Sequence, residues 1–281
     1  MKTLLVFAKR ARAMQTEDVK KITEFLHTYP CKIYIDIPDI KDAEYVENPE
    51  CVIDSADVLV VLGGDGSLIG VARKFASYNK PILGINLGRL GYLVELEKHD
   101  IEALKCLFDE NYRIEERIML KATVTRDGKE VFSTHALNDA VIAKGTVSRM
   151  IHITVSADEQ FVSQYDADGL VVATPTGSTA YSMSAGGTVV APELNVLLLT
   201  PICPHTFSAK PVIVSDKQII KVEARAVNQS SAVLTADGQE SFVLEEGDVV
   251  TLKKSKYTTK LIRLSERNFF HILKHKLEEN R

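Results

Sequence analysis

Cysteine is scarce in this sequence, positive charge is not in excess, and long apolar runs are absent. The four cysteines lie far apart, at positions 31, 51, 106 and 203, and form no C-x-x-C pair, which argues against a disulfide framework or a zinc cluster. The formal net charge of −4 provides no basic field for nucleic acid or an anionic membrane. No run of about 18 apolar residues is present, and the first residues do not resemble a signal peptide. We expect a cytoplasmic protein, with no nucleic acid and no membrane as partners.

What the sequence does contain is the composition of a folded protein long enough for two domains. It has 281 residues, of which 45% are hydrophobic and 26% are charged. In the first part, continuously apolar strands alternate with helices, which indicates a parallel sheet covered on both faces. Residues 1–113 are therefore predicted to form a doubly wound parallel α/β domain. The expected strands are 2–8, 31–36, 56–62 and 81–86, and the expected helices are 16–29, 67–78 and a closing helix around 101–108.

After residue 113 the apolar period changes from helical to alternating. Asp127 and Gly128 are expected to form a hairpin turn within residues 119–134, and a short helix is expected near residues 178–185. Residues 114–264 are thus predicted to form a β-sandwich-like domain. The remaining expected strands are 151–157, 169–174, 195–200, 218–224, 231–237 and 248–254.

The C-terminal residues 265–281 are predicted to form an amphipathic helix that returns to the first domain. Four large apolar side chains share one side of this helix. They are Phe269, Phe270, Leu273 and Leu277.

Residues 58–70, VLVVLGGDGSLIG, place a glycine turn between a buried strand and a helix. Backbone N–H groups and a helix N-terminus suit a phosphate there, which makes Gly63, Gly64 and Gly66 candidate phosphate-binding residues. The segment lacks the Walker lysine and the G-x-G-x-x-G spacing, so neither standard phosphate motif applies. The alternative is a tight turn in which Asp65 merely caps the helix.

Three further segments carry polar groups near expected strand ends. In GINLGRLGYL (84–93), Tyr92 is suited to lie against a base, although an ordinary turn with a core tyrosine explains the segment equally well. In LNDAVI (137–142), Asn138 and Asp139 suit ribose hydroxyls or base edges, although a polar strand end is the commoner explanation. The segment YDADGLVVATPTGSTAYSMSAGG (165–187) ends a strand in small, hydroxylated and glycine residues, with many donors and few bulky side chains.

Together, these motifs resemble those of NAD kinases, enzymes that phosphorylate the 2′-hydroxyl of the adenosine ribose of NAD to make NADP. The blocks GGDG, GINLGRLGYL, ND, DGLVVATPTGSTAYSMSAGG, LTPICPHTFSAKPVIV and DGQ occur in the family's order and cover nearly the whole chain. The resemblance implies a nucleotide-binding α/β domain, an NAD-binding β-sandwich domain and an active site between them. It also implies NAD and ATP as substrates, a divalent metal (Mg²⁺ or Mn²⁺) carried with ATP, and a homodimer or homotetramer.

Transferred residue by residue, the resemblance makes Asp65 the catalytic acceptor of the hydroxyl proton. No side chain is expected to ligate a metal directly. Asp139 stands where many relatives have glutamate, Asp166 where a basic residue is often found, and Lys210 where arginine is usual; the difference at Asp166 weakens the contacts implied near it. The implied substrate-binding residues are Asp65, Gly66, Tyr92, Asn138, Asp139, Arg149, Asp166, Asp168, Thr176, Thr179, Ala180, Tyr181, Ser182, Met183, Ser184 and Gln239.

Under this hypothesis the acidic side chain in the glycine turn faces the acceptor hydroxyl, and Mg²⁺ neutralises the charge conflict with the donor phosphates. Asp65 would orient the hydroxyl and take its proton late in the transfer. Three alternatives fit the sequence less well. Another kinase of the G-G-D-G superfamily would need a lipid or sugar-phosphate pocket, but the sequence shows no exposed apolar helix or basic membrane patch, and the motifs of the second domain fit a dinucleotide better. A catalytically silent NAD sensor would be favoured by loss of the aspartate, which is present. A Rossmann oxidoreductase is weaker still, because KRARAMQTED after the first strand lacks the fingerprint glycines.

Overall fold

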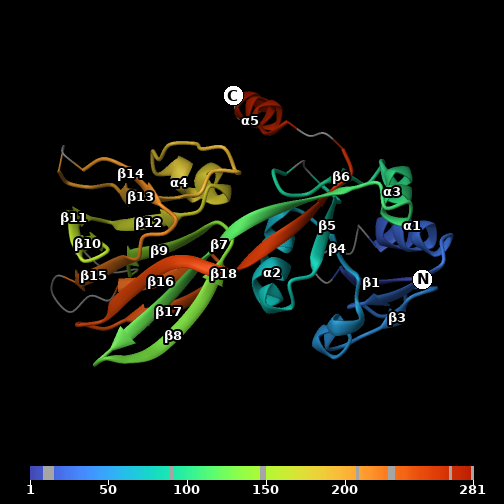
Figure 1. Cartoon of the computed structure of the whole chain (residues 1–281), viewed down its shortest axis with the longest axis horizontal. Helices are drawn as coiled ribbons and strands as arrows, with labels where there is room; N and C mark the ends of the chain where they lie inside the picture. The colour runs from blue at the N-terminus through green and yellow to red at the C-terminus, as the bar shows by residue number, and fades with distance from the viewer. Residues whose placement is uncertain are drawn as a thin grey trace. The chain divides into compact units, whose positions relative to one another are not determined.

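The computed structural model describes residues 1–8, 16–88, 91–145, 150–206, 209–226, 232–265 and 268–279. The chain divides into two compact units, whose helices and strands are labelled in Figure 1. Unit 1 comprises Met1–Glu116 and Thr259–Arg281, and unit 2 is the single segment Arg117–Thr258. The chain therefore enters unit 2 once, along strand β7 (Arg113–Arg126), and leaves it along strand β18 (Val249–Arg263).

Unit 1 is built on a parallel sheet with the strand order β3-β2-β1-β4-β5. The short strand β6 (Leu96–Glu97) and the end of β18 also pair with β5 in parallel. All five residues of β4 are buried, as expected for a strand in a sheet that is covered on both faces. The bounds of the other strands are β1 Lys2–Phe7, β2 Cys31–Ile35, β3 Glu44–Tyr45, β4 Val58–Leu62 and β5 Pro81–Asn86.

Helices cover both faces of this sheet, which confirms the predicted doubly wound fold. On one face, α1 (Thr16–His27) and α3 (Lys105–Phe108) share a core with Leu4 and Val6 of β1. Phe7 points to the opposite face because side chains alternate along a strand, and its ring lies 5.2 Å from that of Phe75, just after α2 (Asp65–Lys74). Short 3₁₀ turns lie at Pro49–Cys51, Ile53–Ser55, Ala76–Tyr78 and Ile101–Leu104.

Helix α5 (Phe269–Glu279) belongs to unit 1, as predicted, but its buried side differs from the predicted one. Ile272 is buried, whereas Phe270 is 63% exposed and Leu277 is 49% exposed. Periodicity alone marks a broad apolar stripe, and packing against unit 1 selects the edge of that stripe that carries Phe269 and Ile272. No helix in the described part of the chain is long and apolar enough to cross a membrane.

Unit 2 is a sandwich of two antiparallel layers, which confirms the predicted β-sandwich-like fold. One layer has six strands in the order β14-β13-β12-β9-β16-β17. The other contains β11, β10, β15 and β18 in that order, with β8 paired to β7 and β7 to β18. Both layers contribute to one apolar core, for example through Ile142 and Val172 from the first and Ile153 and Val222 from the second.

The strands of unit 2 have the following bounds. In the six-stranded layer they are β9 Asp139–Lys144, β12 Gly169–Ala173, β13 Val196–Ile202, β14 Val212–Ser215, β16 Ala232–Ala236 and β17 Glu240–Leu244. In the other layer, besides β7 and β18, they are β8 Lys129–Ala136, β10 Ile151–Ala157, β11 Gln160–Ala167 and β15 Ile220–Ala226. The 3₁₀ turn Thr176–Thr179 and helix α4 (Tyr181–Ser184) follow β12.

The hairpin turn predicted between β7 and β8 is confirmed. Asp127 has a φ of 50° and Gly128 a φ of 74°. Positive φ at both central residues is the geometry of a type I′ turn, which matches the twist of an antiparallel pair. A local Asp-Gly signal was therefore sufficient to locate this turn.

Candidate active site

The glycine turn of unit 1 connects β4 directly to α2. Strand β4 ends at Leu62 and α2 begins at Asp65, with Gly64 as the N-cap residue. Asp65 is therefore the first residue of the helix, and the cap hypothesis is wrong for this side chain. Gly63 has a φ of 153°, and a Cβ built on it would lie 2.7 Å from the Ser67 Oγ atom, so both backbone and packing favour glycine there.

The Asp65 carboxylate is held by a distant loop of the same unit. Its Oδ2 atom accepts a hydrogen bond from the backbone N–H of Tyr92 at 2.7 Å. Its Oδ1 atom accepts from the backbone N–H groups of Leu93 at 3.0 Å and Val94 at 3.2 Å. A Cβ built on Gly91 would lie only 2.1 Å from Oδ1, so the loop approaches this closely because residue 91 is glycine. Three consecutive N–H groups thus fix the orientation of the carboxylate.

The same loop is anchored from behind by Arg263, a buried residue at the end of β18. Its Nη1 atom donates to the carbonyl oxygen of Leu93 at 2.9 Å and to Glu95 Oε2 at 3.2 Å. Its Nε atom donates to Glu115 Oε2 at 2.5 Å. The peptide group between Leu93 and Val94 therefore accepts from a guanidinium through its oxygen and donates to Asp65 through its nitrogen. Such chains of hydrogen bonds polarise and strengthen each other in a buried setting.

Gly64 and Gly66 differ from Gly63 and Gly91. Neither has a positive φ, and a Cβ built on either would meet no heavy atom within 4 Å. The packing of unit 1 therefore does not require glycine at these two positions, and both are exposed. The turn presents bare backbone to its surroundings at the N-terminus of α2.

Tyr92 lies beside this turn, and its side chain is half-buried. Its ring centroid is 6.5 Å from that of Phe269 in α5. Burial, and secondly the charge of Asp65, raise the pKa of the Tyr92 hydroxyl. The Tyr92 ring therefore packs near the C-terminal helix, while the backbone N–H of the same residue donates to Asp65.

In unit 2, three predicted segments meet at one end of the six-stranded layer. Strand β9 begins at Asp139, which pairs with Ala173 at the end of β12. The next residue, Ala140, pairs with Ala236 at the end of β16. Since β9 lies between β12 and β16, the residues around 138, 174–184 and 237–239 gather at this end. The structure thus brings together Asn138, Asp139, the segment after β12 and Gln239.

Asp237 organises this end of the sheet, although it was not among the predicted site residues. Its carboxylate accepts backbone hydrogen bonds from Leu137 and Asn138, both at 2.8 Å, and from Asp139 at 3.1 Å. This arrangement repeats that of Asp65, because one carboxylate again accepts three consecutive N–H groups. The Asn138–Asp139 backbone is therefore fixed by the Asp-Gly-Gln turn.

Gly177 brings the segment after β12 onto the same backbone. A Cβ built on Gly177 would lie 2.1 Å from the carbonyl oxygen of Asn138. Thr174 donates its backbone N–H to that oxygen at 2.8 Å and its hydroxyl to the carbonyl oxygen of Leu137 at 2.6 Å. The segment after β12 is consequently held in a fixed position against residues 137–138.

Asp139 is the titratable group of this cluster whose pKa is most clearly shifted. It is buried and lies beside the Asp237 carboxylate. Burial first, and the charge of Asp237 second, raise the pKa of Asp139 to about 7. Asp139 is therefore protonated over a far wider pH range than an exposed aspartate.

The residues from Thr176 to Ser184 are not equally accessible. Thr176 and Ser182 are buried: the Thr176 hydroxyl oxygen accepts from Arg117 Nη1 at 3.3 Å, and Ser182 Oγ lies 3.0 Å from Thr200 Oγ1. Tyr181, in contrast, is 45% exposed and is not a core tyrosine. Thr179, Ala180 and Met183 are half-buried, and Ser184 and Gln239 are exposed.

Asp166 and Asp168 lie at the other end of β12 and are not brought to this cluster. Asp166 Oδ1 is 2.8 Å from His152 Nδ1, and Asp168 Oδ1 is 2.7 Å from Lys144 Nζ. The 5 residues of β12 lie between Asp168 and Thr174, so these two residues are about 20 Å apart at the usual rise per residue. Arg149 lies outside the described residues.

Comparison with known proteins identifies the family. A model of the ATP-NAD kinase N-terminal domain matches residues 5–112, and a model of the ATP-NAD kinase C-terminal domain matches residues 137–264. The NAD kinase of Trichlorobacter lovleyi is 38% identical over 99% of both chains. The NAD kinase of Heliobacterium modesticaldum is 45% identical over 87% of this chain and 88% of that protein. The chain belongs to the NAD kinase family.

Solved structures of NAD and NADH kinases share the fold. Yeast NADH kinase complexed with NADH superimposes with a TM-score of 0.88 at 25% identity, covering 99% of this chain and 88% of that one. An NAD kinase from Archaeoglobus fulgidus in complex with ATP gives a TM-score of 0.76 at 26% identity, covering 99% of both chains. The α/β unit, the antiparallel unit and the C-terminal helix are therefore the NAD kinase fold.

Three residues with clear structural roles were missed by sequence reasoning. Asp237 lies in the DGQ block, which was noted only for Gln239. Gly91 lies in the GINLGRLGYL block but was not connected to Asp65. Arg263 lies outside every block, and nothing in its sequence neighbourhood indicates that it anchors the loop at Leu93 and Glu95.

Replacing Gly91 with alanine is expected to displace the Asp65 carboxylate, because the new Cβ would lie 2.1 Å from Oδ1. We expect a loss of stability of about 1–3 kcal/mol and a fall in NADP formation of roughly tenfold or more. The matched control is Gly88→Ala in the same loop, where the Cβ would lie 4.0 Å from Asn86 Oδ1 and stability should change by less than about 0.5 kcal/mol. Thermal unfolding of both variants and NADP formation by Gly91→Ala check this. Unchanged stability of Gly91→Ala would contradict the close approach.

Asp139 is expected to make folding less favourable as pH rises. Its pKa of about 7 in the folded protein exceeds that of an unfolded aspartate, about 3.9, so the folded state binds more protons between these values and stability falls as pH rises through this window. The free energy of unfolding of Asp139→Asn, relative to that of wild type, should therefore rise by about 2–3 kcal/mol between pH 5 and pH 8. Urea unfolding at both pH values measures this. Asp127→Asn, which changes an exposed turn residue, is the control, and an equal gain there would refute the assignment.

Proposed function

We propose that this chain transfers a phosphoryl group from ATP to the 2′-hydroxyl of the adenosine ribose of NAD, with Asp65 as the catalytic group. ATP-dependent phosphorylation of NAD to NADP is the activity of the family to which the chain belongs. The observation that supports the residue assignment is the hydrogen bonding of the Asp65 carboxylate. A carboxylate has about four acceptor positions, and the backbone N–H groups of residues 92–94 occupy three of them. One position on Oδ2 is left for a donor such as the ribose hydroxyl.

The donor phosphates are proposed to lie against the backbone of Gly63, Gly64 and Gly66. The open space at Gly64 and Gly66 supports this, because glycine there is not explained by the packing of unit 1. The N-terminus of α2, a helix of 10 residues, adds favourable N–H groups and the positive end of its dipole. Phosphates bound this way would be close to an acidic side chain, so their charge must be neutralised.

A divalent cation, Mg²⁺ or Mn²⁺, is proposed to enter with ATP and to supply that neutralisation. Asp65 is already engaged by three N–H groups, so phosphate oxygens and water would provide most of the cation's ligands. Asp65 would meanwhile orient the ribose hydroxyl and accept its proton as the new bond to phosphorus forms. Its main contribution would be positioning, since phosphoryl transfer has a loose transition state.

We propose that unit 2, which corresponds to the predicted domain 114–264, binds NAD. Unit 1, which corresponds to residues 1–113 with the C-terminal helix 265–281, is proposed to bind the nucleotide donor. The cluster around Asn138, Asp139 and Asp237 supports this, because it fixes polar groups beside an exposed aromatic ring, Tyr181. The proposed NAD contacts in unit 2 are Asn138, Asp139, Arg149, Asp166, Asp168, Thr176, Thr179, Ala180, Tyr181, Ser182, Met183, Ser184 and Gln239. In unit 1 they are Asp65, Gly66 and Tyr92.

We also propose a cytoplasmic homodimer or homotetramer. The edge strands β14 and β17 carry exposed apolar side chains, with Ile213 45% and Val243 58% exposed, and uncovered edges are disfavoured in proteins that remain in solution.

Asp65→Asn separates catalysis from binding. The amide keeps the size of the side chain but cannot accept a proton, so turnover should fall by roughly 10²- to 10⁴-fold. NAD affinity should survive, because the unit 2 contacts remain and a negative charge near the pyrophosphate is removed. NADP formation by enzymatic cycling and NAD affinity by calorimetry, on one folded preparation, provide the test. A variant that forms NADP at a near wild-type rate would remove Asp65 from the catalytic role.

Tyr181→Ala should weaken NAD binding without unfolding the protein. The ring is 45% exposed, so its removal costs little packing, whereas loss of stacking on a nucleoside should raise the KM for NAD by about three- to tenfold. Tyr181→Phe keeps the ring and is expected to behave like wild type. Steady-state kinetics and thermal unfolding should be measured on both variants. A marked drop in Tm with an unchanged KM would assign the ring to packing.

A further inference from the structure

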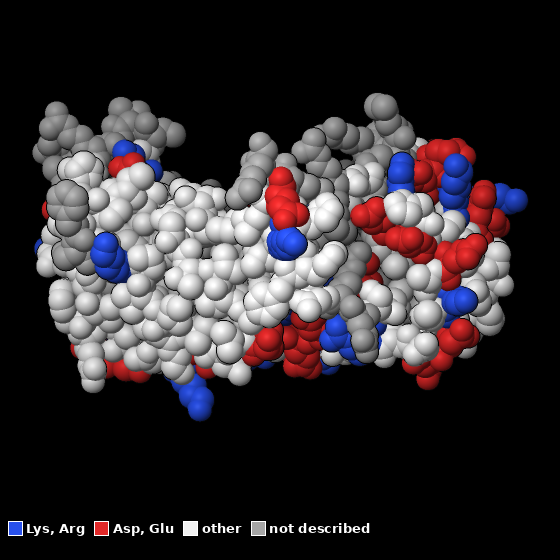
Figure 2. All heavy atoms as spheres, turned by 90° about the horizontal axis from the view of Figure 1, so that it is seen from above, with Lys and Arg blue, Asp and Glu red and all other residues white. Residues whose placement is uncertain are grey.

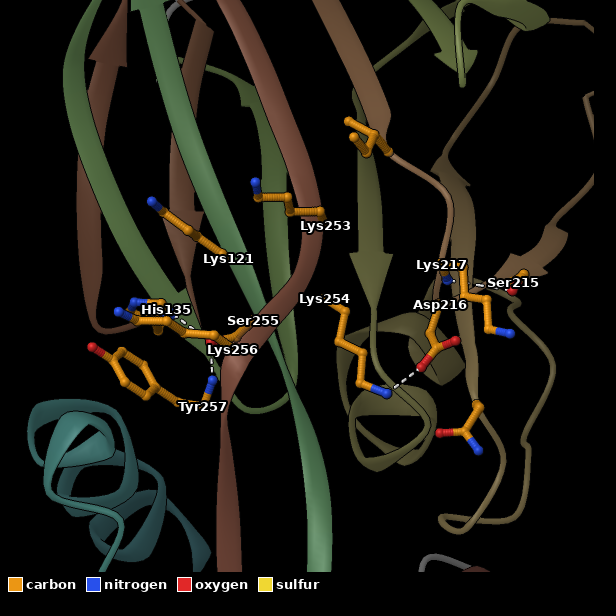
Figure 3. A pocket seen from close by; sticks show the side chains of 12 residues that line it. Lys121, His135, Ser215, Asp216, Lys217, Lys253, Lys254, Ser255, Lys256 and Tyr257 are labelled. Atoms are coloured by element: carbon orange, nitrogen blue, oxygen red, sulfur yellow. Dashed lines mark hydrogen bonds and ion pairs between the residues drawn. The ribbon is translucent and has the colours of Figure 1, made fainter.

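Unit 2 contains a groove that none of the proposed substrate contacts lines. It is a cavity of about 1110 Å³, lined by residues of β7, β8, β18 and the turn after β14. Figure 3 shows its side chains, which include Lys121, His135, Asp216 and Tyr257. We call it the lysine groove, after Lys121, Lys217, Lys253, Lys254 and Lys256.

The groove has a large excess of positive charge. Asp216 is the one acidic residue in its lining; it is buried and accepts from Lys254, so this pair is neutral. The remaining lysines form no ion pair with any residue that the structure describes. Yet the whole chain has a net charge of −4. On the face drawn in Figure 2, acidic side chains are most numerous over unit 1, and few Lys or Arg side chains are visible on unit 2. The unpaired lysines are Lys121, Lys217, Lys253 and Lys256.

The local structure of β18 produces this concentration of lysines. Burial alternates along the strand up to Leu252, but Lys253 and Lys254 are both exposed before Ser255 is buried again. This break in alternation directs two successive lysines away from the core, as a bulge does. Lys121 extends from β7, which pairs with β18, so the cations come from neighbouring strands (Figure 3).

One wall of the groove is rigidly built. Ser255 Oγ accepts from the backbone N–H of Tyr257 at 2.9 Å and lies 2.9 Å from His135 Nδ1. The rings of His135 and Tyr257 meet edge to face with centroids 5.1 Å apart. Lys256 Nζ is 5.0 Å from the centre of the Tyr257 ring. The polar and aromatic groups beside the lysines are therefore held in place before any ligand binds, which lowers the entropic cost of binding.

We propose that the lysine groove binds a multiply charged phosphate anion of the linear polyphosphate type, at a site additional to the proposed active site. Four lysines without an ion pair to any described residue line one groove, and a ligand with about four negative charges would balance their summed charge. A single orthophosphate, with a charge near −2, would balance half of it. Lysine suits this role because its ammonium group acts as a mobile point charge toward phosphate. Inorganic tripolyphosphate and the triphosphate of a nucleotide share this chemistry.

The test compares two charge-matched double variants of the full-length protein. Lys121→Gln with Lys253→Gln removes two groove cations, and Lys129→Gln with Lys221→Gln removes two cations elsewhere in unit 2, one on an exposed lysine and one on a half-buried lysine that pairs with Glu159. Titration calorimetry with tripolyphosphate should show affinity at least about tenfold weaker for the groove variant and within about twofold of wild type for the control. Orthophosphate should bind wild type much more weakly than tripolyphosphate. Equal losses in both variants, or no loss in the groove variant, overturn the proposal.

Two further measurements identify the ligand and separate the groove from catalysis. With ATP, one binding site fewer per chain in the groove variant assigns the groove to nucleotide triphosphates as well, whereas unchanged ATP stoichiometry restricts it to inorganic chains. NADP formation at saturating ATP should stay within about twofold of wild type. A large fall in turnover, with Tm unchanged, would place these lysines on the catalytic path and overturn an additional site. Lys217→Gln with Lys256→Gln repeats the test if the first groove variant is unstable.

Discussion

The Asp65 carboxylate accepts three backbone hydrogen bonds from residues 92–94, and most of the proposed active site in unit 1 depends on this contact. It fixes the first residue of α2 relative to the loop after β5. It also explains Gly91, whose missing side chain is what allows the loop to reach the carboxylate. A carboxylate that could turn freely toward a bound phosphate would repel it. The three hydrogen bonds hold the Asp65 carboxylate, so the fold and not the ligand determines its orientation.

Unit 2 contains a second carboxylate that holds a loop by accepting backbone hydrogen bonds. Asp237 accepts three consecutive N–H groups and thereby fixes Asn138 and Asp139. The cost is electrostatic, since burial first, and the charge of the neighbouring Asp237 second, raise the pKa of Asp139. A backbone held by a carboxylate is rigid and needs no regular secondary structure. Both proposed ligand-contact regions therefore rest on loops that a single acidic side chain makes rigid.

Much of the fold could be predicted because its signals are local. The buried strand before Gly63 is continuously apolar, and the Asp127–Gly128 pair specifies a hairpin turn by its own backbone preferences. The position of Asp65 was also predictable, from the glycine turn and the family resemblance. Its partners were not, because they are backbone N–H groups 27 to 29 residues away, and every residue except proline carries such a group.

Other features depend on tertiary packing that no periodicity encodes. Phe270 and Leu277 belong to the apolar stripe of α5, but the rest of unit 1 determines which edge of that stripe is buried. Asp166 and Asp168 are close in sequence to the segment after β12, yet a strand carries them to the opposite end of the sheet. Arg263 is one of many basic residues in the sequence, and only the structure places it behind Leu93.

Unit 2 is one continuous stretch of chain inserted into unit 1, and this affects the order in which the parts can form during synthesis. A ribosome releases the chain from its N-terminus, so all of residues 117–258 emerge before Leu261 can pair with β5 or Arg263 can bind the Leu93 carbonyl. The sandwich can close while unit 1 still lacks its last strand. A nascent or prematurely terminated chain would thus carry the GGDG turn and residues 92–94 without the guanidinium that anchors this loop from behind, and full activity would arise only near the end of translation.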